Sequence, residues 1–191
     1  MSFRIEHRIG VAAPASEVWD LVYNLEGWKD WTGVYSEARG KIAIGETLHF
    51  TFAVGDRPPM SAVATVYDWV PEAQLAWNAR LAGGVRTLRY VEIEKLSETS
   101  CILSNGDYYS GFGTIFMSRQ LRRDIRATFQ RMNENGKRIA EARWVEKGGT
   151  VDPTPARRVS PLTIQPLGPT VKPAKPWGFG GRGFGPKLNA P

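Results

Sequence analysis

Three polar side chains occupy alternate positions in the segment 101–109, where the residues fall in a pattern typical of a strand. They are Asn105, Asp107 and Tyr109, and alternate residues of a strand share one face. On a buried face they would form a polar triplet in an apolar pocket, suited to orienting a ligand carbonyl or hydroxyl. Burial would raise the pKa of the Asp107 carboxyl toward that of a general acid or base. The alternative is that Asp107 caps the turn into the next helix or faces water.

A basic residue, Arg89, lies in the preceding apolar segment 87–94 and alternates in step with Val91 and Ile93. If the Val91 face is buried, Arg89 points into the same pocket. It would then pair with Asp107 or bind an anionic ligand group, because an unpaired buried charge is very costly. An exposed Arg89 is an equally open interpretation.

Aromatic residues are abundant, with 7 Trp, 6 Tyr and 8 Phe. Aromatic walls stack and bury much area, so part of this set suits a pocket for a flat apolar ligand. Core packing is the alternative for each residue taken singly. The candidate ligand-binding residues are Trp28, Trp31, Phe50, Phe52, Trp77, Arg89, Val91, Asn105, Ile125 and Phe129.

Other kinds of chemistry are excluded by missing residues. The single cysteine, Cys101, allows neither an internal disulfide nor a multi-cysteine metal site. No cluster of His, Cys and carboxylates has metal-ligand spacing, and no nucleophile elbow or Walker sequence is present. The glycines of residues 180–185 follow no strand and precede no helix, so they predict no phosphate cradle. We therefore expect no metal and no cofactor.

The order of the predicted elements follows from hydrophobic periodicity. Residues 3–11 alternate apolar and polar side chains, which predicts a strand. Apolar residues at helical spacing from Val18 to Leu25 predict a short helix, and Trp28 and Trp31, three apart, predict a second. Between residues 35 and 107, turn residues divide the chain into about six antiparallel strands. With the first, about seven strands form a meander.

After Gly111 the pattern becomes helical and predicts one helix of about 30 residues that ends near Trp144. Its apolar stripe consists of Ile115, Leu121, Ile125, Phe129, Met132, Ile139 and Ala140. A basic stripe, Arg119, Arg122, Arg123 and Arg126, lies on the other side. Such a stripe is usually a solvated face, and the functional alternative is contact with anionic lipid or an acidic partner.

Composition divides the chain in two. Residues 1–145 hold 18 Lys and Arg against 17 Asp and Glu, whereas residues 146–191 hold 7 against 2. The net charge of +6 therefore lies mostly in the last part, which argues against a nucleic-acid partner for the folded part. Residues 146–191 also contain 9 of the 13 prolines, which predicts a basic, Pro/Gly-rich extension, extended or disordered.

No apolar run reaches the ~20 residues of a transmembrane helix. The first ten residues carry charged side chains and lack the apolar core of a signal peptide. We therefore expect a cytoplasmic protein.

Four motifs, in this order, resemble the START/Bet v-type superfamily called SRPBCC, especially its bacterial polyketide cyclase/dehydrase-like branch. They lie at residues 11–22, 28–31, 68–77 and 107–112. The resemblance covers residues 3–145 and implies an α+β helix-grip fold for a domain at residues 1–145. In this fold a curved antiparallel sheet, two short helices and one long C-terminal helix enclose a cavity.

The resemblance also implies what the cavity holds and how the strands are oriented. Related cavities hold lipids, sterols, aromatic polyketides or other apolar molecules, and the face with Asn105, Asp107 and Tyr109 points inward. Trp28 and Trp31 are expected at the cavity mouth, where the short helices meet the long one.

Three functions follow as hypotheses. The first is binding of a hydrophobic or aromatic small molecule or a lipid in the cavity. The second is a cyclase or dehydratase in which Asp107 and Tyr109 are catalytic. The third is an adaptor or assembly subunit that docks onto a protein partner through residues 146–191. The superfamily contains both carriers and enzymes, so the resemblance leaves catalysis open.

Overall fold

The computed structural model describes residues 2–151, which form a seven-stranded sheet, three α-helices and three short 3-10 helices. Of the predicted extension at residues 146–191, only 146–151 lie within the described residues. In chain order the elements are β1 (Ser2–Val11), α1 (Ala15–Tyr23), η1 (Leu25–Gly27), α2 (Trp28–Trp31), β2 (Tyr35–Gly40), β3 (Thr47–Phe52), β4 (Met60–Val70), β5 (Gln74–Leu81), η2 (Ala82–Gly84), β6 (Val85–Ser97), β7 (Ser100–Ser110), η3 (Phe112–Phe116) and α3 (Arg119–Glu146).

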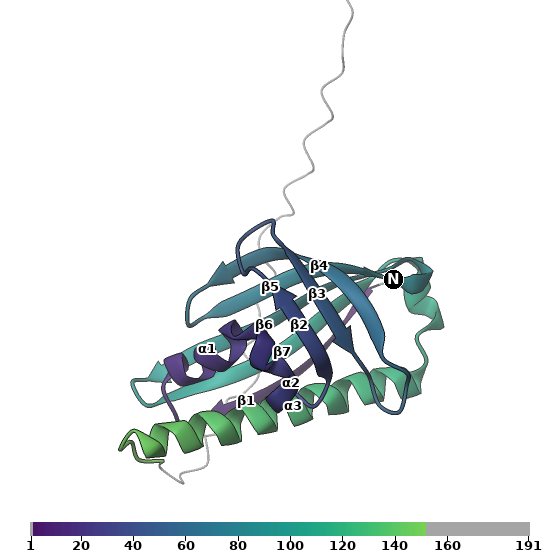
Figure 1. Ribbon diagram of the computed structural model, residues 1–191. Helices are drawn as coiled ribbons and strands as arrows, with labels where there is room; N and C mark the ends of the chain where they lie inside the picture. The colour runs from purple at the N-terminus through teal and green to yellow at the C-terminus, as the bar shows by residue number, and fades with distance from the viewer. Residues whose placement is uncertain (1, 152–191) are drawn as a thin grey trace, which may run out of the picture. The chain divides into compact units, whose positions relative to one another are not determined.

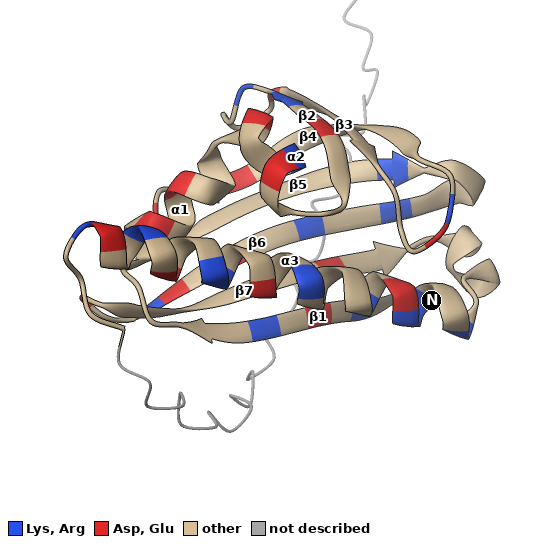
Figure 2. Ribbon diagram, turned by 60° about the horizontal axis from the view of Figure 1, so that its bottom comes forward, with Lys and Arg blue, Asp and Glu red and all other residues tan. Residues whose placement is uncertain are grey.

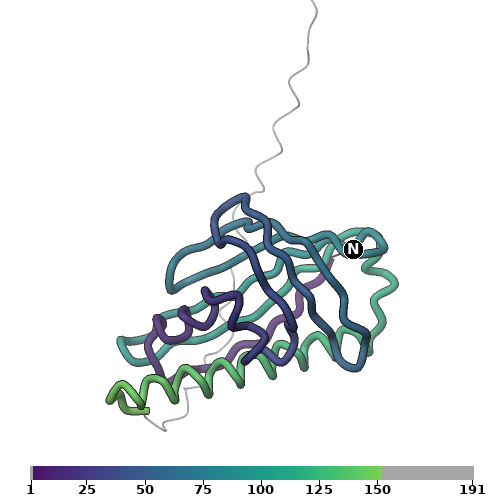
Figure 3. The backbone as a smooth tube through the Cα atoms, viewed as in Figure 1, coloured from purple at the N-terminus to yellow at the C-terminus, as the bar shows by residue number. Residues whose placement is uncertain are grey.

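Strands β2 to β7 form an antiparallel meander, and β1 pairs with β7 to form the second edge of the sheet. The strand order is β1-β7-β6-β5-β4-β3-β2, with every neighbouring pair antiparallel. The strands curve around α3, which runs along the concave face, while α1 and α2 lie toward the C-terminal part of α3 (Figures 1 and 3). This arrangement confirms the predicted α+β helix-grip fold with its seven-stranded sheet, two short helices and one long helix.

Helix α3 begins and ends at clear signals. The Ser118 side chain accepts a hydrogen bond from the Leu121 backbone N–H at 3.1 Å, which caps the first turn. At the other end Gly148 adopts a φ of 84°, a conformation that favours glycine. Because the cap lies at Ser118, Ile115 belongs to η3 and is exposed, so its predicted place in the apolar stripe of the long helix is wrong.

The apolar interior has two parts along α3. The closed end is the larger cluster, in which α1 and α2 pack onto the sheet, with Trp28, Leu103, Met132 and Ala140 among its members. The open end is the smaller cluster of Ile5, Val85, Tyr109, Ile125 and Phe129. No helix within residues 2–151 combines the length and the apolar character needed to cross a membrane.

Candidate functional site

A cavity of about 180 Å³ lies between the inner face of the sheet and α3, where the two clusters meet, and extends into the open end. Most of its lining is apolar or aromatic, and the few polar side chains converge from β6, β7 and α3. It is lined by Val34, Tyr35, Phe50, Phe52, Val54, Arg57, Pro58, Met60, Ala62, Trp77, Leu81, Thr87, Arg89, Asp107, Tyr109, Met117, Leu121, Ile125, Thr128 and Phe129.

Strand register brings the polar lining together. Asp107 on β7 lies directly opposite Arg89 on β6, and Arg89 lies opposite Trp77 on β5. The next inward row places Tyr109 opposite Thr87. Because side chains alternate along each strand, both rows face the same side, toward α3. The sheet therefore supplies a carboxyl, a guanidinium and a phenol to one wall of the cavity.

Asp107 is buried, with 5% of its surface exposed. Burial raises the pKa of its carboxyl to about 7, while the charge of Arg89 and the nearby Tyr109 hydroxyl act in the opposite direction. Its Oδ1 atom is buried without a hydrogen-bond partner in the protein. The Tyr109 pKa is raised, first by burial and then by the negative charge of Asp107. A buried carboxyl with this pKa can take up or release a proton near neutral pH.

Arg89 is held from several sides. Its Nη2 donates to Asn105 Oδ1 at 3.0 Å, and its guanidinium carbon lies 4.1 Å from the centre of the Phe129 ring. Such a cation-π contact partly replaces the water lost on burial. Nevertheless the Nε atom of Arg89 is buried without a partner, as is Thr128 Oγ1 on α3. Two donors and one carboxylate oxygen are thus unsatisfied around one cavity.

A second set of polar side chains, Asn105, Asn133 and His7, adjoins Arg89, and its members form hydrogen bonds with one another. Asn105 Nδ2 donates to Asn133 Oδ1 at 2.8 Å, and Asn133 Nδ2 donates to the His7 carbonyl at 2.8 Å. The Asn133 amide also lies 3.0 Å from His7 Nδ1, and the His7 pKa is lowered, chiefly by burial. This network fixes Asn105, which in turn fixes the guanidinium of Arg89. Its role is positioning, since Asn105 does not line the cavity.

Most of the residues predicted to form the site lie on the cavity wall. Those that line it are Phe50, Phe52, Trp77, Arg89, Asp107, Tyr109, Ile125 and Phe129. Four predicted ligand-binding residues do not line it: Trp28, Trp31, Val91 and Asn105. Their roles as ligand contacts therefore have no support in the geometry.

Trp28 and Trp31 lie in the core and not at the cavity mouth, which corrects the position expected for them. Trp28 is 1% exposed, packs against Tyr35 and Phe50, and donates its indole N–H to the Val22 carbonyl at 3.0 Å. Trp31 packs against the glycine of α3, Gly136. Helix α2, which carries both tryptophans, packs into the closed end, so the two indoles contribute to core packing.

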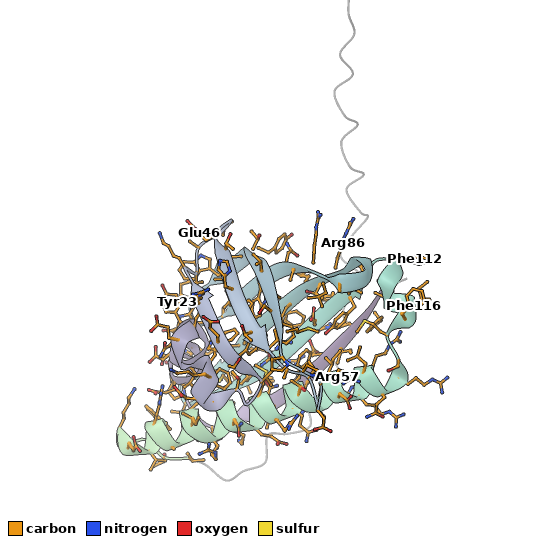
Figure 4. All side chains as sticks on the ribbon, turned by 45° about the vertical axis from the view of Figure 1, so that its right-hand side comes forward. Tyr23, Glu46, Arg57, Arg86, Phe112 and Phe116 are labelled. Atoms are coloured by element: carbon orange, nitrogen blue, oxygen red, sulfur yellow. The ribbon has the colours of Figure 1, made fainter. Side chains whose placement is uncertain are left out.

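Four residues that the sequence analysis did not assign to the site also line the cavity, and because they are only partly buried or exposed we take them as its mouth. Arg57 and Pro58, from the β3–β4 connection, face Met117 and Leu121 across the opening. Arg57 Nη1 reaches α3 and donates to Asp124 Oδ2 at 2.7 Å (Figure 4). Thr128 was also missed, although its position three residues after Ile125 on the helix places it on the same face.

The described residues contain no group of three or more His, Cys, Asp or Glu side chains that could hold a metal ion. The fold and the cavity together define a helix-grip protein with an internal pocket. The sequence matches the polyketide cyclase/dehydrase and lipid transport family over residues 2–137, and the chain belongs to this family. The predicted resemblance to the SRPBCC superfamily is confirmed.

Solved structures with the same fold are distant in sequence. The aromatase/cyclase Zhui from Streptomyces sp. R1128 is 16% identical with a TM-score of 0.57, covering 78% of this chain and 100% of its own. Norcoclaurine synthase from Thalictrum flavum is 15% identical with a TM-score of 0.55, covering 74% and 93%. Ara h 8.0201 is 9% identical with a TM-score of 0.58, covering 74% and 99%. No curated protein matches the sequence. These similarities establish the fold.

Proposed function

We propose that the chain binds a small, largely apolar molecule with one polar end in the cavity at the open end. The observation that carries this proposal is the set of unsatisfied polar atoms, Asp107 Oδ1, Arg89 Nε and Thr128 Oγ1, around an otherwise apolar cavity. Leaving buried polar groups unpaired costs about 1–3 kcal/mol each, and a ligand that pairs with them recovers part of that cost. Family membership supports a ligand-binding or cyclase-like role.

The size of the cavity limits the ligand. Its volume of about 180 Å³ is close to that of an engineered cavity of roughly 150 Å³ that holds benzene, and below the ~300 Å³ of typical drug-sized pockets. One aromatic ring with a polar substituent therefore fits inside. A longer polyketide or a lipid would enter by one end only, with the remainder passing Arg57 and Leu121 at the mouth.

The charges of Arg89 and Asp107 limit which polar group the ligand can carry. An anionic group beside Arg89 would also face the Asp107 carboxyl, and a cationic group would face Arg89. A neutral hydroxyl avoids both conflicts, because its oxygen accepts from Arg89 Nε and its O–H donates to Asp107 Oδ1, and a neutral carbonyl avoids them by accepting from Arg89 Nε alone. We infer a neutral ligand at neutral pH.

Catalysis is the second candidate, favoured by the pKa of about 7 for Asp107. In a cyclase or dehydratase reaction Asp107 would take a proton from a carbon next to a ligand carbonyl, whose oxygen accepts a hydrogen bond from Arg89. Tyr109 would orient the carboxyl. Asp107→Asn would then abolish turnover while the ligand still binds, and full turnover in this variant would exclude Asp107 as the acid or base.

Two parts of the sequence interpretation stay proposals. We assign binding to a domain at residues 1–145 and treat residues 146–191 as a separate extension. An adaptor role for that extension is tested by deleting residues 146–191 and comparing which proteins co-purify. Identical partners would remove the adaptor hypothesis.

Binding is tested by native mass spectrometry of gently purified protein, followed by extraction and identification of any retained small molecule. The matched variants are Ala62→Phe, which fills the cavity, and Val63→Phe, which adds the same ring at an exposed neighbouring position. Retained mass in wild type and Val63→Phe but not in Ala62→Phe supports the proposal. Equal retention in all three places the ligand elsewhere.

A further inference from the structure

Three large apolar side chains project from η3 beside the cavity mouth. Phe112 is 74% exposed, Phe116 is 77% exposed and Ile115 is 54% exposed. We call these three residues the aromatic tip; Figure 4 shows Phe112 and Phe116 pointing outward at one end of the described domain. Single exposed apolar residues are ordinary, but a contiguous group marks an interaction site.

The exposure of the tip is built into the local backbone. In the sequence Gly-Phe-Gly-Thr-Ile-Phe, the small residues face inward and the large ones face outward. A Cβ added to Gly113 would lie 2.1 Å from the Gly83 carbonyl, and one added to Gly111 would lie 2.3 Å from the Gly84 carbonyl. Thr114 is buried and its hydroxyl donates to the Gly111 carbonyl at 2.8 Å. Because η3 packs closely on η2 through its small residues, the large side chains of η3 point toward solvent.

The surroundings of the tip are basic. No Asp or Glu occurs between residues 74 and 91 or between residues 108 and 123. Exposed arginines there are Arg80 and Arg86, which face each other across β5 and β6, and Arg119 and Arg123 at the start of α3. Along α3 the first acidic residue is Asp124, and Figure 2 shows acidic and basic residues mixed farther along the helix. An acidic surface is therefore the electrostatic complement of this end.

The tip also adjoins the cavity. Met117 follows η3 directly, and together with Leu121 it lines the opening. The residue that follows the tip in the chain therefore lines the cavity. The shape favours a bilayer over a protein partner, because a stable protein interface buries about 800 Å² per partner, more than three projecting side chains supply. Membrane binding requires only a few inserted side chains and a cluster of positive charges.

We propose that the aromatic tip inserts into the interfacial layer of a bilayer that contains acidic phospholipids, with Arg86, Arg119 and Arg123 at the headgroups. This membrane contact does not depend on the ligand proposed for the cavity. It would bring the cavity mouth to the membrane surface. Burial of the two Phe rings supplies the apolar term. Each arginine near an anionic surface adds about 1 kcal/mol, which corresponds to roughly a fivefold change in binding.

The test is co-sedimentation of the full chain with phosphatidylcholine vesicles, with and without phosphatidylglycerol. Phe112→Ser/Phe116→Ser is expected to weaken binding to the acidic vesicles by about tenfold or more. The matched control, Tyr67→Ser/Val70→Ser, removes two other exposed apolar side chains and should bind as wild type does. Because all variants keep residues 146–191, any contribution of the basic extension is the same throughout.

Charge is tested separately. Arg119→Gln/Arg123→Gln should weaken binding by about 25-fold, whereas Arg131→Gln/Arg138→Gln, at exposed positions farther along α3, should have little effect. Wild type that binds neither vesicle, or tip variants that bind as tightly as their controls, would overturn the proposal.

Insertion itself is read from a fluorophore at the tip. Ile115→Cys, labelled with an environment-sensitive dye, should show a blue-shifted emission when acidic vesicles are added, while labelled Tyr67→Cys should not. Cys101 is buried, and burial raises the pKa of its thiol to about 11, so it competes poorly for the label. An unchanged emission from position 115 would exclude insertion and would favour a protein partner for the tip.

Discussion

The two ends of the helix-grip core are built from similar residues but differ in whether their unsatisfied polar atoms border the cavity. At the closed end, Trp28 donates to the Val22 carbonyl and Asn105 donates to Asn133, and the one unpartnered indole nitrogen of α2, Trp31 Nε1, does not border the cavity. At the open end, Asp107, Arg89 and Thr128 each keep a buried atom without a partner. Native cores satisfy nearly all buried polar groups, so three unsatisfied atoms gathered on one cavity wall indicate a place for a ligand, and the completed bonds of Trp28, Asn105 and Asn133 indicate structural support.

The same strands serve both ends. Strand β7 carries Leu103 and Asn105 in the closed end and Asp107 and Tyr109 on the cavity wall, with one alternation throughout. Rigid packing at one end therefore fixes the register, and hence the position of Asp107, at the other. Mutations at the closed end should act on stability, and those at the open end on binding and proton affinity.

The largest difference in stability between the two ends is expected from the same Leu→Ala substitution made at each end. Leu103→Ala at the closed end, where the side chain is fully buried, should lower the free energy of unfolding by about 4 kcal/mol, because it leaves a cavity in a packed core. Leu121→Ala at the open end borders an existing cavity and is only half-buried, so its cost should be about 1 kcal/mol. Urea unfolding measures both values. Equal costs would mean that the open end is as tightly packed as the closed end.

The next contrast is a pH dependence that belongs to Asp107. The unfolded chain releases this proton near the ordinary aspartate pKa, while the folded chain holds it until about pH 7. Between those values the folded chain binds more protons, so the free energy of unfolding falls as pH rises, by roughly 2 to 3 kcal/mol from about pH 5 to about pH 8. Above about pH 8 the loss becomes constant.

Asp107→Asn should remove this fall, and the measurement is the difference in urea midpoints between the two pH values for wild type and variant. Asp68→Asn is the control, because this carboxyl lies in the closed half of β4 and accepts from Gln74 at 3.0 Å. If the variant and wild type lose the same stability with rising pH, the raised pKa of Asp107 is wrong.

Periodicity and the family resemblance predicted the fold and the inward face of the strand that carries Asp107, whereas the direction of Arg89 was left open. Alternation alone placed Asp107 and Tyr109 on one face, and the inward direction of that face followed from the resemblance. Depth along the core was not predictable: Trp28 and Phe50 both read as inward aromatics, yet only Phe50 borders the cavity. Which inward residues surround unfilled space depends on how the sheet and α3 close together, and no local pattern records that.

Contacts between distant segments were also beyond the sequence. Arg57 lies in a turn-rich connection, and nothing near it indicates a bond to Asp124, 67 residues away. Ile115 was assigned to the long helix because its spacing fits the apolar stripe, whereas the cap at Ser118 starts that helix later. The missed Arg57 contact lies at the mouth and the misassigned Ile115 lies in the tip. In both places tertiary contacts outweigh local propensity.

The smallest expected effect concerns the Arg57–Asp124 ion pair, which joins the β3–β4 connection to α3 across the mouth. The two groups are partly solvated, so the pair should add little to global stability. Its effect should appear in kinetics, because releasing Arg57 and Pro58 from the helix widens the path to the cavity. Asp124→Asn should therefore leave the urea midpoint nearly unchanged and speed both entry and release of a bound ligand severalfold, measured by stopped-flow tryptophan fluorescence. Glu134→Gln, an exposed carboxylate farther along α3, is the control. Equal exchange rates in the two variants would place the entry path elsewhere, and a large loss of stability in Asp124→Asn would make this ion pair part of the core support and not of the mouth.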